Sequence, residues 1–370
     1  MDGMARALEL ARQALGATSP NPAVGAVVVR DGQLVGEGFT QPPGQAHAEV
    51  VALGMAGEKA RGASLYVTLE PCPHYGRTPP CTRAIIQSGL REVHLAFLDP
   101  NPLVRGAGRR QLESAGIQVV VGEGEEASRK LLEAYCKFIT TGLPFLTAKF
   151  AASLDGKIAA RGGDSRWITG EPARREAHRL RAISDAVMVG IGTVLADDPL
   201  LTARDAQDQP LSRQPLRVVV DSQARTPPSA RLLRPSAEGL RPPGSVLIAC
   251  AHAPQARIRA LRDAGAEVVE AAAEDGRVDL KELLRLLGQR QVTSILAEGG
   301  SALLGSFFDL GLVDKVAAFI APVIVGGAGG VPAVGGQGAA SMAQALRLAD
   351  REVHHLGDDL LVVGYPRLGA

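Results

Sequence analysis

One stretch, residues 46 to 83, constrains this chain more than any other. It holds His47 and Glu49 near its start and Cys72 and Cys81 near its end. One histidine and two cysteines can bind a zinc ion and leave a fourth position open for water, as catalytic rather than structural sites do. A nearby glutamate that is not a ligand can move protons between that water and a substrate. The pattern therefore predicts a catalytic zinc site.

The spacing of these residues separates the roles further. His47 and Glu49 fall in the first turn of a predicted helix, and Cys81 begins another, where helix dipoles favour thiolates. Residues two apart on a helix do not face each other, so we expect Glu49 to be a proton shuttle rather than a second ligand. His74 competes as a ligand, but substrate contact or loop structure is preferred for it. His-x-Glu followed by Pro-Cys and a second Cys marks zinc deaminases of nucleobases, so the first hypothesis is hydrolytic deamination of a heterocyclic amine.

The composition narrows the class of protein. A chain of 370 residues favours two domains, and 46% apolar with 21% charged residues is ordinary for a soluble globular protein. The net charge of +1 argues against a surface that coats nucleic acid. No apolar run is long enough to span a membrane and the N-terminus does not resemble a signal peptide, so we expect a cytoplasmic protein. Of the remaining cysteines, Cys136 and Cys250 lie in apolar stretches and are expected to be buried.

Strand and helix patterns alternate along the whole chain. In residues 1–143 the predicted helices are 4–15, 47–55, 81–90, 108–115 and 125–140, and the predicted strands 24–30, 33–39, 65–69, 93–98 and 117–121. A turn at Thr141 to Pro144 marks the boundary with a second domain, 144–370. There the predicted strands are 145–150, 186–191, 217–221, 246–250, 267–270, 294–297 and 315–320, with one helix at 171–181 and others between. Residues 205–214 and 226–244 are rich in Pro and Arg and indicate surface loops. The alternation predicts α/β sheets covered on both faces.

The N-terminal half resembles the cytidine-deaminase superfamily and, within it, the deaminase of bacterial riboflavin biosynthesis. The resemblance rests on residues 21–25 (NPAVG), on His47-Ala48-Glu49, and on Pro71-Cys72 followed by eight residues and Cys81. Nucleoside, cytosine and transfer-RNA deaminases usually have two residues between the cysteines. The resemblance implies a three-layer deaminase fold, Zn²⁺, and a diaminopyrimidinone substrate that carries a phosphoribosylamino group.

The same resemblance implies a set of substrate-binding residues in this half. They are Asn21, His74, Arg77, Asp99 and Asn101. The alternative for Asn21, Asp99 and Asn101 is turn chemistry, because each precedes a proline.

The second half offers weaker signals of its own. Glu298 is followed by Gly299, Gly300 and Ser301 between a predicted strand and a predicted helix, where bare N–H groups can hold a phosphate. Residues 324–330 form another glycine-rich loop after a strand. Neither matches the GxGxxG fingerprint, and each is equally consistent with a simple turn.

Several longer motifs in this half resemble the reductase of the riboflavin pathway. They are Lys149 with residues 153–157 (SLDGK), residues 165–169 (SRWIT), residues 193–204 (TVLADDPLLTAR), residues 220–222 (VDS) and residues 298–300 (EGG). The resemblance implies a dihydrofolate-reductase-like α/β domain that uses NADPH to reduce a ribosyl group to a ribityl chain. The preference for NADPH over NADH rests on the resemblance alone.

Site residues in this half follow from the resemblance in the same way. The implied cofactor-binding residues are Ala151, Trp167, Thr193, Asp197, Ser222, Gly299, Gly300 and Ser301. The implied substrate-binding residues are Ser165, Arg181, Leu200, Arg204 and Glu298. Arg181 and Arg204 suit a phosphate ester because guanidinium presents a fixed fork of donors. Lys149 and Asp197 are expected to polarise or protonate the sugar. The alternative for Trp167, the chain's one tryptophan, is core packing.

The leading hypothesis is thus a bifunctional enzyme whose partner is a small phosphorylated pyrimidine, with no nucleic acid or membrane. A homo-oligomer, dimer or tetramer, is expected, and Phe307, Phe308 and Leu310 are either core or a dimer seam. One alternative is a nucleic-acid or nucleoside deaminase with an accessory domain, which predicts a basic groove and a short Cys spacing. Another is a structural zinc site closed by a fourth protein ligand.

Overall fold

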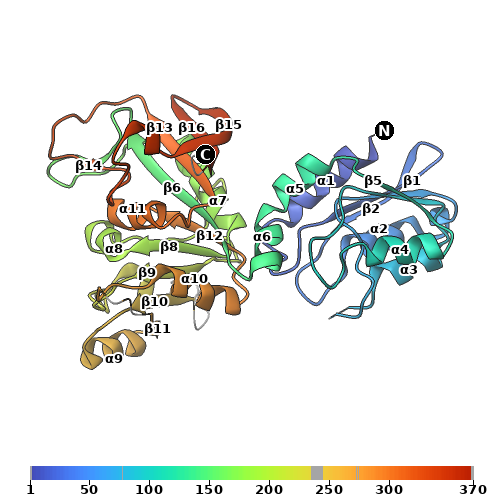
Figure 1. Ribbon diagram of the computed structural model, residues 1–370, viewed down its shortest axis with the longest axis horizontal. Helices are drawn as coiled ribbons and strands as arrows, with labels where there is room; N and C mark the ends of the chain where they lie inside the picture. The colour runs from blue at the N-terminus through green and yellow to red at the C-terminus, as the bar shows by residue number, and fades with distance from the viewer. Residues whose placement is uncertain (1, 77, 235–244, 272, 274, 368–370) are drawn as a thin grey trace. The chain divides into compact units, whose positions relative to one another are not determined.

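The chain forms two compact units, Met1–Leu143 and Pro144–Ala370, in a computed structural model (Figure 1). The structure describes residues 2–76, 78–234, 245–271, 273 and 275–367. Within these ranges, no helix is long and apolar enough to cross a membrane.

Unit 1 is built on a five-stranded sheet, counted over its described residues, in the order β2-β1-β3-β4-β5. The strands are β1 (Gly25–Arg30), β2 (Gln33–Phe39), β3 (Ser64–Val67), β4 (Glu92–Leu95) and β5 (Gln118–Val121). β1 runs antiparallel to both neighbours, whereas β3, β4 and β5 are parallel. The carboxyl ends of β3 and β4 therefore lie at the same edge of the sheet.

Helices cover both faces of this sheet. They are α1 (Gly3–Ala14), α2 (Ala48–Ala56), the 3-10 helix η1 (Gly57–Ala60), α3 (Cys81–Ser88), α4 (Ala107–Ser114), α5 (Glu125–Leu131) and α6 (Glu133–Thr141). Glycines on the strands let two of these helices approach the sheet closely. An added Cβ at Gly25 would lie 1.9 Å from the carbonyl oxygen of Ala7 in α1, and one at Gly36 would lie 2.2 Å from that of Ala52 in α2. Gly25 pairs with Phe39, three residues from Gly36, so α1 and α2 occupy opposite faces. The predicted three-layer arrangement is confirmed.

Unit 2 is built on a nine-stranded sheet, counted over its described residues, in the order β11-β10-β9-β8-β12-β6-β13-β16-β15. The strands are β6 (Phe145–Ser153), β8 (Ala186–Gly190), β9 (Leu216–Val220), β10 (Val246–Cys250), β11 (Glu267–Glu270), β12 (Ser294–Glu298), β13 (Lys315–Ala321), β15 (Arg347–Leu356) and β16 (Asp359–Arg367). From β11 to β13 the neighbours are parallel, and β16 and β15 add an antiparallel hairpin at one edge. The α/β architecture expected from the alternation is confirmed.

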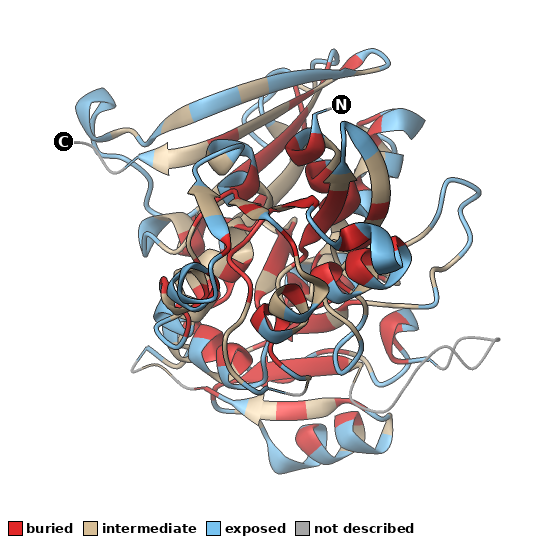
Figure 2. Cartoon of the chain, turned by 90° about the vertical axis from the view of Figure 1, so that its right-hand side faces the viewer, coloured by how far each residue is buried: buried red, intermediate tan, exposed pale blue. Residues whose placement is uncertain are grey.

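The other elements of unit 2 connect or flank these strands. The helices are α7 (Glu171–Ile183), α8 (Ile191–Asp197), α9 (Gln255–Asp263), α10 (Leu280–Gln289) and α11 (Ser301–Asp309), with 3-10 turns η2 (Arg231–Leu233) and η3 (Met342–Gln344). β7 (Lys157–Ala159) and β14 (Val331–Pro332) form a separate small sheet. Figure 2 shows the buried residues concentrated on the central strands.

The structure differs from the sequence-based expectations at several places. The predicted helix 125–140 is broken at Leu132 into α5 and α6. The hairpin β15–β16 was not predicted, because β15 is an edge strand with mostly exposed residues and so lacks a clear hydrophobic alternation. The stretch 226–244 was expected to be surface loop, yet Leu232 and Leu233 in it are buried, and its residues 235–244 lie outside the described part of the chain. Of the two cysteines expected to be buried, Cys250 is buried and Cys136 is half-buried.

Candidate active sites

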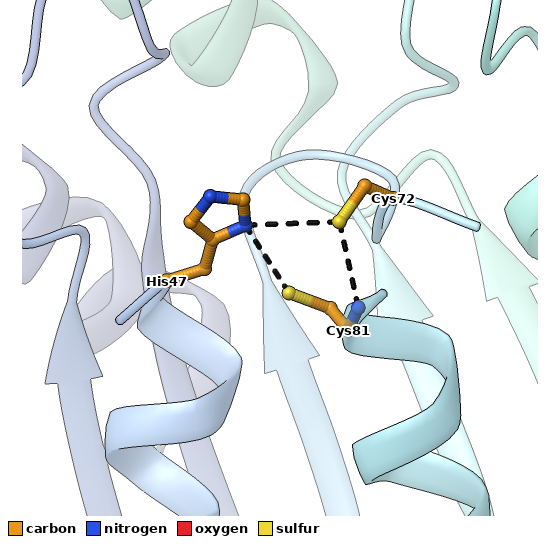
Figure 3. Close-up of side chains that lie close together, drawn as sticks. All are labelled: His47, Cys72 and Cys81. Atoms are coloured by element: carbon orange, nitrogen blue, oxygen red, sulfur yellow. Dashed lines mark hydrogen bonds between the residues drawn. The ribbon is translucent and has the colours of Figure 1, made fainter. Parts of the chain in front are cut away.

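Three side chains of unit 1 meet at one point, as Figure 3 shows. His47 caps the start of α2, Cys72 follows β3, and Cys81 is the first residue of α3. The Nδ1 atom of His47 lies 3.7 Å from the Sγ of Cys72 and 3.3 Å from the Sγ of Cys81. All three ligand atoms lie within 4.8 Å of one another, and no other such group occurs among the described residues. One nitrogen and two sulfurs so close together fit a zinc ion that keeps a fourth position open.

Local contacts favour the ionised, metal-binding form of Cys72. The backbone N–H of Cys81 points at the Sγ of Cys72, 3.4 Å away. Hydrogen bonds from Cys81 and His47 lower the pKa of the Cys72 thiol to about 4, against the effect of burial. The thiolate is the form that binds metal. The other ring nitrogen of His47, Nε2, lies 3.5 Å from the hydroxyl of Thr78.

Glu49 lies in the first turn of α2 and is only 4% exposed. Burial raises the pKa of its carboxyl to about 6. A carboxyl with a pKa near neutrality can accept a proton and then give it up, which is what a shuttle requires. The role of Glu49 as proton shuttle stays a prediction, which its burial and raised pKa support.

The expected substrate-binding residues of unit 1 have different surroundings. The buried Nδ1 atom of His74 has no hydrogen-bond partner in the described structure. Asn21 is half-buried in a turn, its N–H donating to the carbonyl of Thr18 at 2.8 Å. Arg77 lies outside the described residues.

Asp99 and Asn101 are engaged by the protein itself. Asp99 is 5% exposed, and its carboxylate accepts bonds from the hydroxyl of Tyr135 at 3.0 Å and from the N–H of Asn101 at 2.9 Å. The Asn101 side chain in turn accepts from the N–H of Leu103 at 3.0 Å. Turn chemistry accounts for the two bonds from backbone N–H groups, whereas the bond from Tyr135 is a contact with α6. Substrate contact at both residues stays a prediction.

A buried cluster of charges lies at the carboxyl end of β12 in unit 2. The Glu298 carboxylate accepts two bonds from Arg181 of α7, at 2.5 and 2.7 Å, and lies 3.8 Å from the Nζ of Lys149. Glu298 and Lys149 are direct neighbours because β12 and β6 pair in that register. Although burial opposes it, the charges of Arg181 and Lys149 lower the pKa of Glu298 to about 2. Burial lowers the pKa of Lys149.

The glycine loop after β12 approaches the start of α8. Gly299 and Gly300 have φ angles of 59° and 76°, a region that favours glycine. A Cβ at Gly300 would lie 3.2 Å from the hydroxyl oxygen of Thr193. Gly300 also caps α11, which begins at Ser301, so the free N–H groups of that helix start at this loop. The structure thus brings Gly299 and Gly300, two of the expected cofactor-binding positions, together with Thr193.

Other expected residues of unit 2 flank this region. The hydroxyl of Ser165 donates to the carboxylate of Asp197 at 3.2 Å. Trp167 is 72% exposed and its ring is covered on one side by the guanidinium of Arg174, 4.6 Å from the ring centre. Core packing is therefore excluded as the reason for the single tryptophan. An exposed aromatic ring is available to a ligand.

The remaining expected positions are partly occupied by protein contacts. The hydroxyl of Ser222 accepts from the N–H of Val278 at 3.2 Å. The Nη1 atom of Arg204 donates to the carbonyl and carboxylate of Asp208, which is exposed. Ala151, in the middle of β6, and Leu200, after α8, are both half-buried.

Two side chains beside the sites were not predicted from the sequence. Thr78 faces His47, and His178 lies one turn before Arg181 on α7. The signal for His178 was present in the sequence, because residues three apart on the predicted helix 171–181 share a face.

Comparisons with known proteins agree with both halves. Residues 2–97 match the family described as cytidine and deoxycytidylate deaminase zinc-binding region, and residues 144–362 match the RibD C-terminal domain. The riboflavin biosynthesis protein RibD of Aquifex aeolicus is 42% identical over 97% of this chain and 96% of its own length. That of Escherichia coli is 42% identical over 96% of each chain.

Solved structures show the same likeness along the whole chain. Acinetobacter baumannii RibD has a TM-score of 0.85 and 40% identity, covering 99% of this chain and 98% of that one. A Thermotoga maritima protein described as a diaminohydroxyphosphoribosylaminopyrimidine deaminase/5-amino-6-(5-phosphoribosylamino)uracil reductase has a TM-score of 0.83 and 36% identity, with the same coverage.

The fold and the sites define a bifunctional enzyme that joins a zinc-binding deaminase domain to a reductase domain of the type that uses NADPH. Its place among such enzymes follows from the full-length similarity at about 40% identity. The chain belongs to the RibD family of riboflavin biosynthesis proteins.

Proposed function

We propose that unit 1 hydrolytically deaminates 2,5-diamino-6-(5-phosphoribosylamino)pyrimidin-4(3H)-one and that unit 2 reduces the ribosyl group of the product to a ribityl chain. The observation that carries this proposal is the meeting of His47, Cys72 and Cys81 beside the buried Glu49. The match of residues 144–362 to the RibD C-terminal domain supports the second activity.

In unit 1 the chain binds the metal and handles the protons. His47, Cys72 and Cys81 would hold the zinc ion, which supplies Lewis-acid activation of a water molecule when it is bound. Glu49 accepts a proton as the water oxygen bonds to the amine-bearing ring carbon. It then donates this proton to the departing nitrogen, so the carbon–nitrogen bond breaks, ammonia leaves, and the ring keeps the oxygen. Because burial raises the pKa of Glu49 to about 6, its carboxyl can both accept this proton and release it.

In unit 2 the chain orients the sugar and supplies a proton. NADPH, when bound, provides the hydride that C1′ of the ribose gains. Lys149 donates a proton to the ring oxygen as the bond between that oxygen and C1′ breaks, so the sugar opens. The Glu298 carboxylate lies 3.8 Å from the Nζ of Lys149 and keeps it in place. Asp197, which accepts a hydrogen bond from Ser165, is the second residue that acts on the sugar. Arg204 receives the phosphate ester through its positive charge and its Nη2 atom, since Nε and Nη1 donate to Thr202 and Asp208.

Substitution of Glu49 by Gln tests the deaminase half. The variant keeps the shape of the side chain, but its amide can neither accept nor release the proton, so we expect ammonia release to fall at least about 100-fold. Zinc content, measured by atomic absorption, should stay at the wild-type level because Glu49 is not a ligand. Glu58→Gln, an exposed glutamate of η1, is the matched control and should leave the rate unchanged. Wild-type deamination by a zinc-loaded Glu49→Gln protein would contradict the proposal.

Substitution of Arg204 by Ala tests the phosphate role. We expect the KM for the deaminated, phosphorylated substrate to rise about tenfold or more in an assay of NADPH oxidation, because a charge-assisted pair is lost. The KM for NADPH should change little. An unchanged KM for the phosphorylated substrate would remove Arg204 from the proposed site.

The assembly and location of the protein also belong to this proposal. A homo-oligomer, dimer or tetramer, acting in the cytoplasm is expected. Phe307 is fully buried and thus part of the core, whereas Leu310 is 44% exposed and remains available for a subunit contact. Light scattering of the purified protein measures the oligomeric state directly, and a monomeric mass would remove the oligomer from the proposal.

A further inference from the structure

Two side chains of α7 converge on a single backbone carbonyl. The Nδ1 atom of His178 lies 3.1 Å from the carbonyl oxygen of Thr202, and the Nη1 atom of Arg181 donates to the same oxygen at 3.2 Å. His178 and Arg181 are three residues apart and so lie on the same side of the helix. The other two guanidinium nitrogens of Arg181, Nε and Nη2, donate to Glu298.

The contact with Thr202 fixes the state of the His178 ring. A carbonyl oxygen only accepts, so Nδ1 must carry the hydrogen. Burial, reinforced by the nearby charge of Arg181, lowers the pKa of His178. The ring therefore donates to the carbonyl of Thr202 as a neutral group at neutral pH, and it adds no charge beside Arg181, Arg204 and Glu298.

The segment that receives these bonds leads directly to Arg204. The hydroxyl oxygen of Thr202 accepts from the Nε of Arg204 at 3.2 Å. Both backbone groups of Ala203 are bonded to the side chain of Gln214, at 2.8 and 2.9 Å. Leu201 is 3% exposed and has a φ of 56°, which a leucine rarely adopts without support from its surroundings. The segment is thus held by α7 at Thr202 and by Gln214 at Ala203.

We propose that His178 is a positioning residue for substrate binding in unit 2. Its Nδ1–H donates to the carbonyl of Thr202 and so fixes this residue. The hydroxyl of Thr202 then holds the Nε of Arg204, in the orientation that receives the phosphate of the substrate. The inference rests on the phosphate role proposed above for Arg204. Arg181 donates to the same carbonyl, so loss of His178 removes one of the two side-chain bonds that hold Thr202.

Two substitutions separate this role from simple packing. His178→Leu fills similar space and removes the donor, while His178→Asn keeps an N–H near the position of Nδ1. For His178→Leu we expect the KM for the phosphorylated substrate to rise about five- to tenfold, the range for one lost hydrogen bond. The value of kcat and the KM for NADPH should stay within about twofold, and His178→Asn should recover most of the loss. Arg179→Ala, an exposed position on the same helix, is the control.

A second readout uses the same deaminated substrate without its phosphate. If His178 acts through Arg204, the preference in kcat/KM for the phosphorylated over the dephosphorylated substrate should fall about five- to tenfold in His178→Leu. A packing defect would lower both values equally, and that result would overturn the inference. Should His178→Leu fail to fold, His178→Gln, whose amide reaches the position of Nε2 instead, replaces it with the same expected loss.

The double substitution His178→Leu with Arg204→Ala separates this inference from the proposed function. If His178 works through Arg204, the double variant should bind the phosphorylated substrate as weakly as Arg204→Ala alone, measured as Kd by calorimetry. Additive losses would show that His178 acts elsewhere and would overturn the inference only. An Arg204→Ala protein with wild-type Kd would instead defeat the phosphate role itself.

Discussion

At the scale of single residues, three buried carboxyls differ in charge because their neighbours differ. Glu298 has Arg181 and Lys149 beside it, and these charges hold its pKa at about 2 despite burial. Burial raises the pKa of Glu49 to about 6 and that of Asp99 also to about 6. Glu298 is thus a permanent anion that orders cations, whereas the other two carboxyls can exchange protons near neutrality.

The raised pKa of Asp99 predicts a pH-dependent stability. A buried carboxyl with a folded pKa above its unfolded value stabilises the fold while it is protonated and loses this contribution as pH rises through the folded pKa. Relative to Asp99→Asn, we therefore expect the wild type to lose about 2 kcal/mol of unfolding free energy between pH 4 and pH 7. Urea denaturation of both zinc-loaded proteins across this range measures the difference. A difference that is independent of pH would mean that Asp99 stays ionised throughout.

At the scale of elements, the packing of α2 on β2 places the zinc ligand His47. Gly36 of β2 lets the helix approach, because a Cβ there would lie 2.2 Å from the Ala52 carbonyl and 2.8 Å from the Ala56 nitrogen. Contacts this short involve backbone atoms and cannot be relieved by turning a side chain. The position of α2, and with it that of His47 and Glu49, thus depends on a glycine of the neighbouring strand β2.

Substitution of Gly36 by Ala should therefore push α2 away from the sheet. We expect a loss of about 2 kcal/mol of unfolding free energy, typical of overpacking, together with weaker zinc binding. Gly54→Ala is the matched control: it lies in α2 itself, with no atom within 4 Å of an added Cβ. That change should be neutral or stabilising by up to about 1 kcal/mol, because alanine favours helices. Competition with a zinc-binding dye and urea denaturation measure the two effects, and equal behaviour of the two variants would contradict the packing argument.

At the scale of the whole molecule, each activity belongs to a unit with its own sheet and its own buried residues. The metal-binding group lies wholly in unit 1, and the Lys149–Glu298–Arg181 cluster lies wholly in unit 2. Among the described residues, the members of each cluster all come from one unit. The two reactions should therefore respond separately to a perturbation of one site.

Removal of zinc is the direct test of this separation. After treatment with a chelator, we expect ammonia release to be lost, while NADPH oxidation with the deaminated substrate stays within about twofold of its rate in the untreated protein. Added Zn²⁺ should restore deamination. An equal loss of both activities, with the fold retained by circular dichroism, would show that the metal supports the reductase as well.

The sequence by itself determined the zinc group, the strand–helix alternation and the division near residue 143. These features depend on residue type and short-range order: few side chains bind zinc, and hydrophobic periodicity follows local backbone geometry. That is why His47, Cys72 and Cys81 could be chosen before their positions were known, and why Glu49 could be told apart from them.

Only the tertiary structure decided how distant segments combine. The guanidinium of Arg181 is bonded to Glu298, which lies 117 residues away in the chain, while its contact with substrate stays a prediction. The register between β6 and β12 sets Lys149 beside the same carboxylate, and no local pattern encodes that register. The exposure of Trp167 and the bond from His178 to Thr202 depend in the same way on packing between elements. Residue types identify the chemistry, but contacts between segments far apart in the sequence fix which side chains are available to perform it.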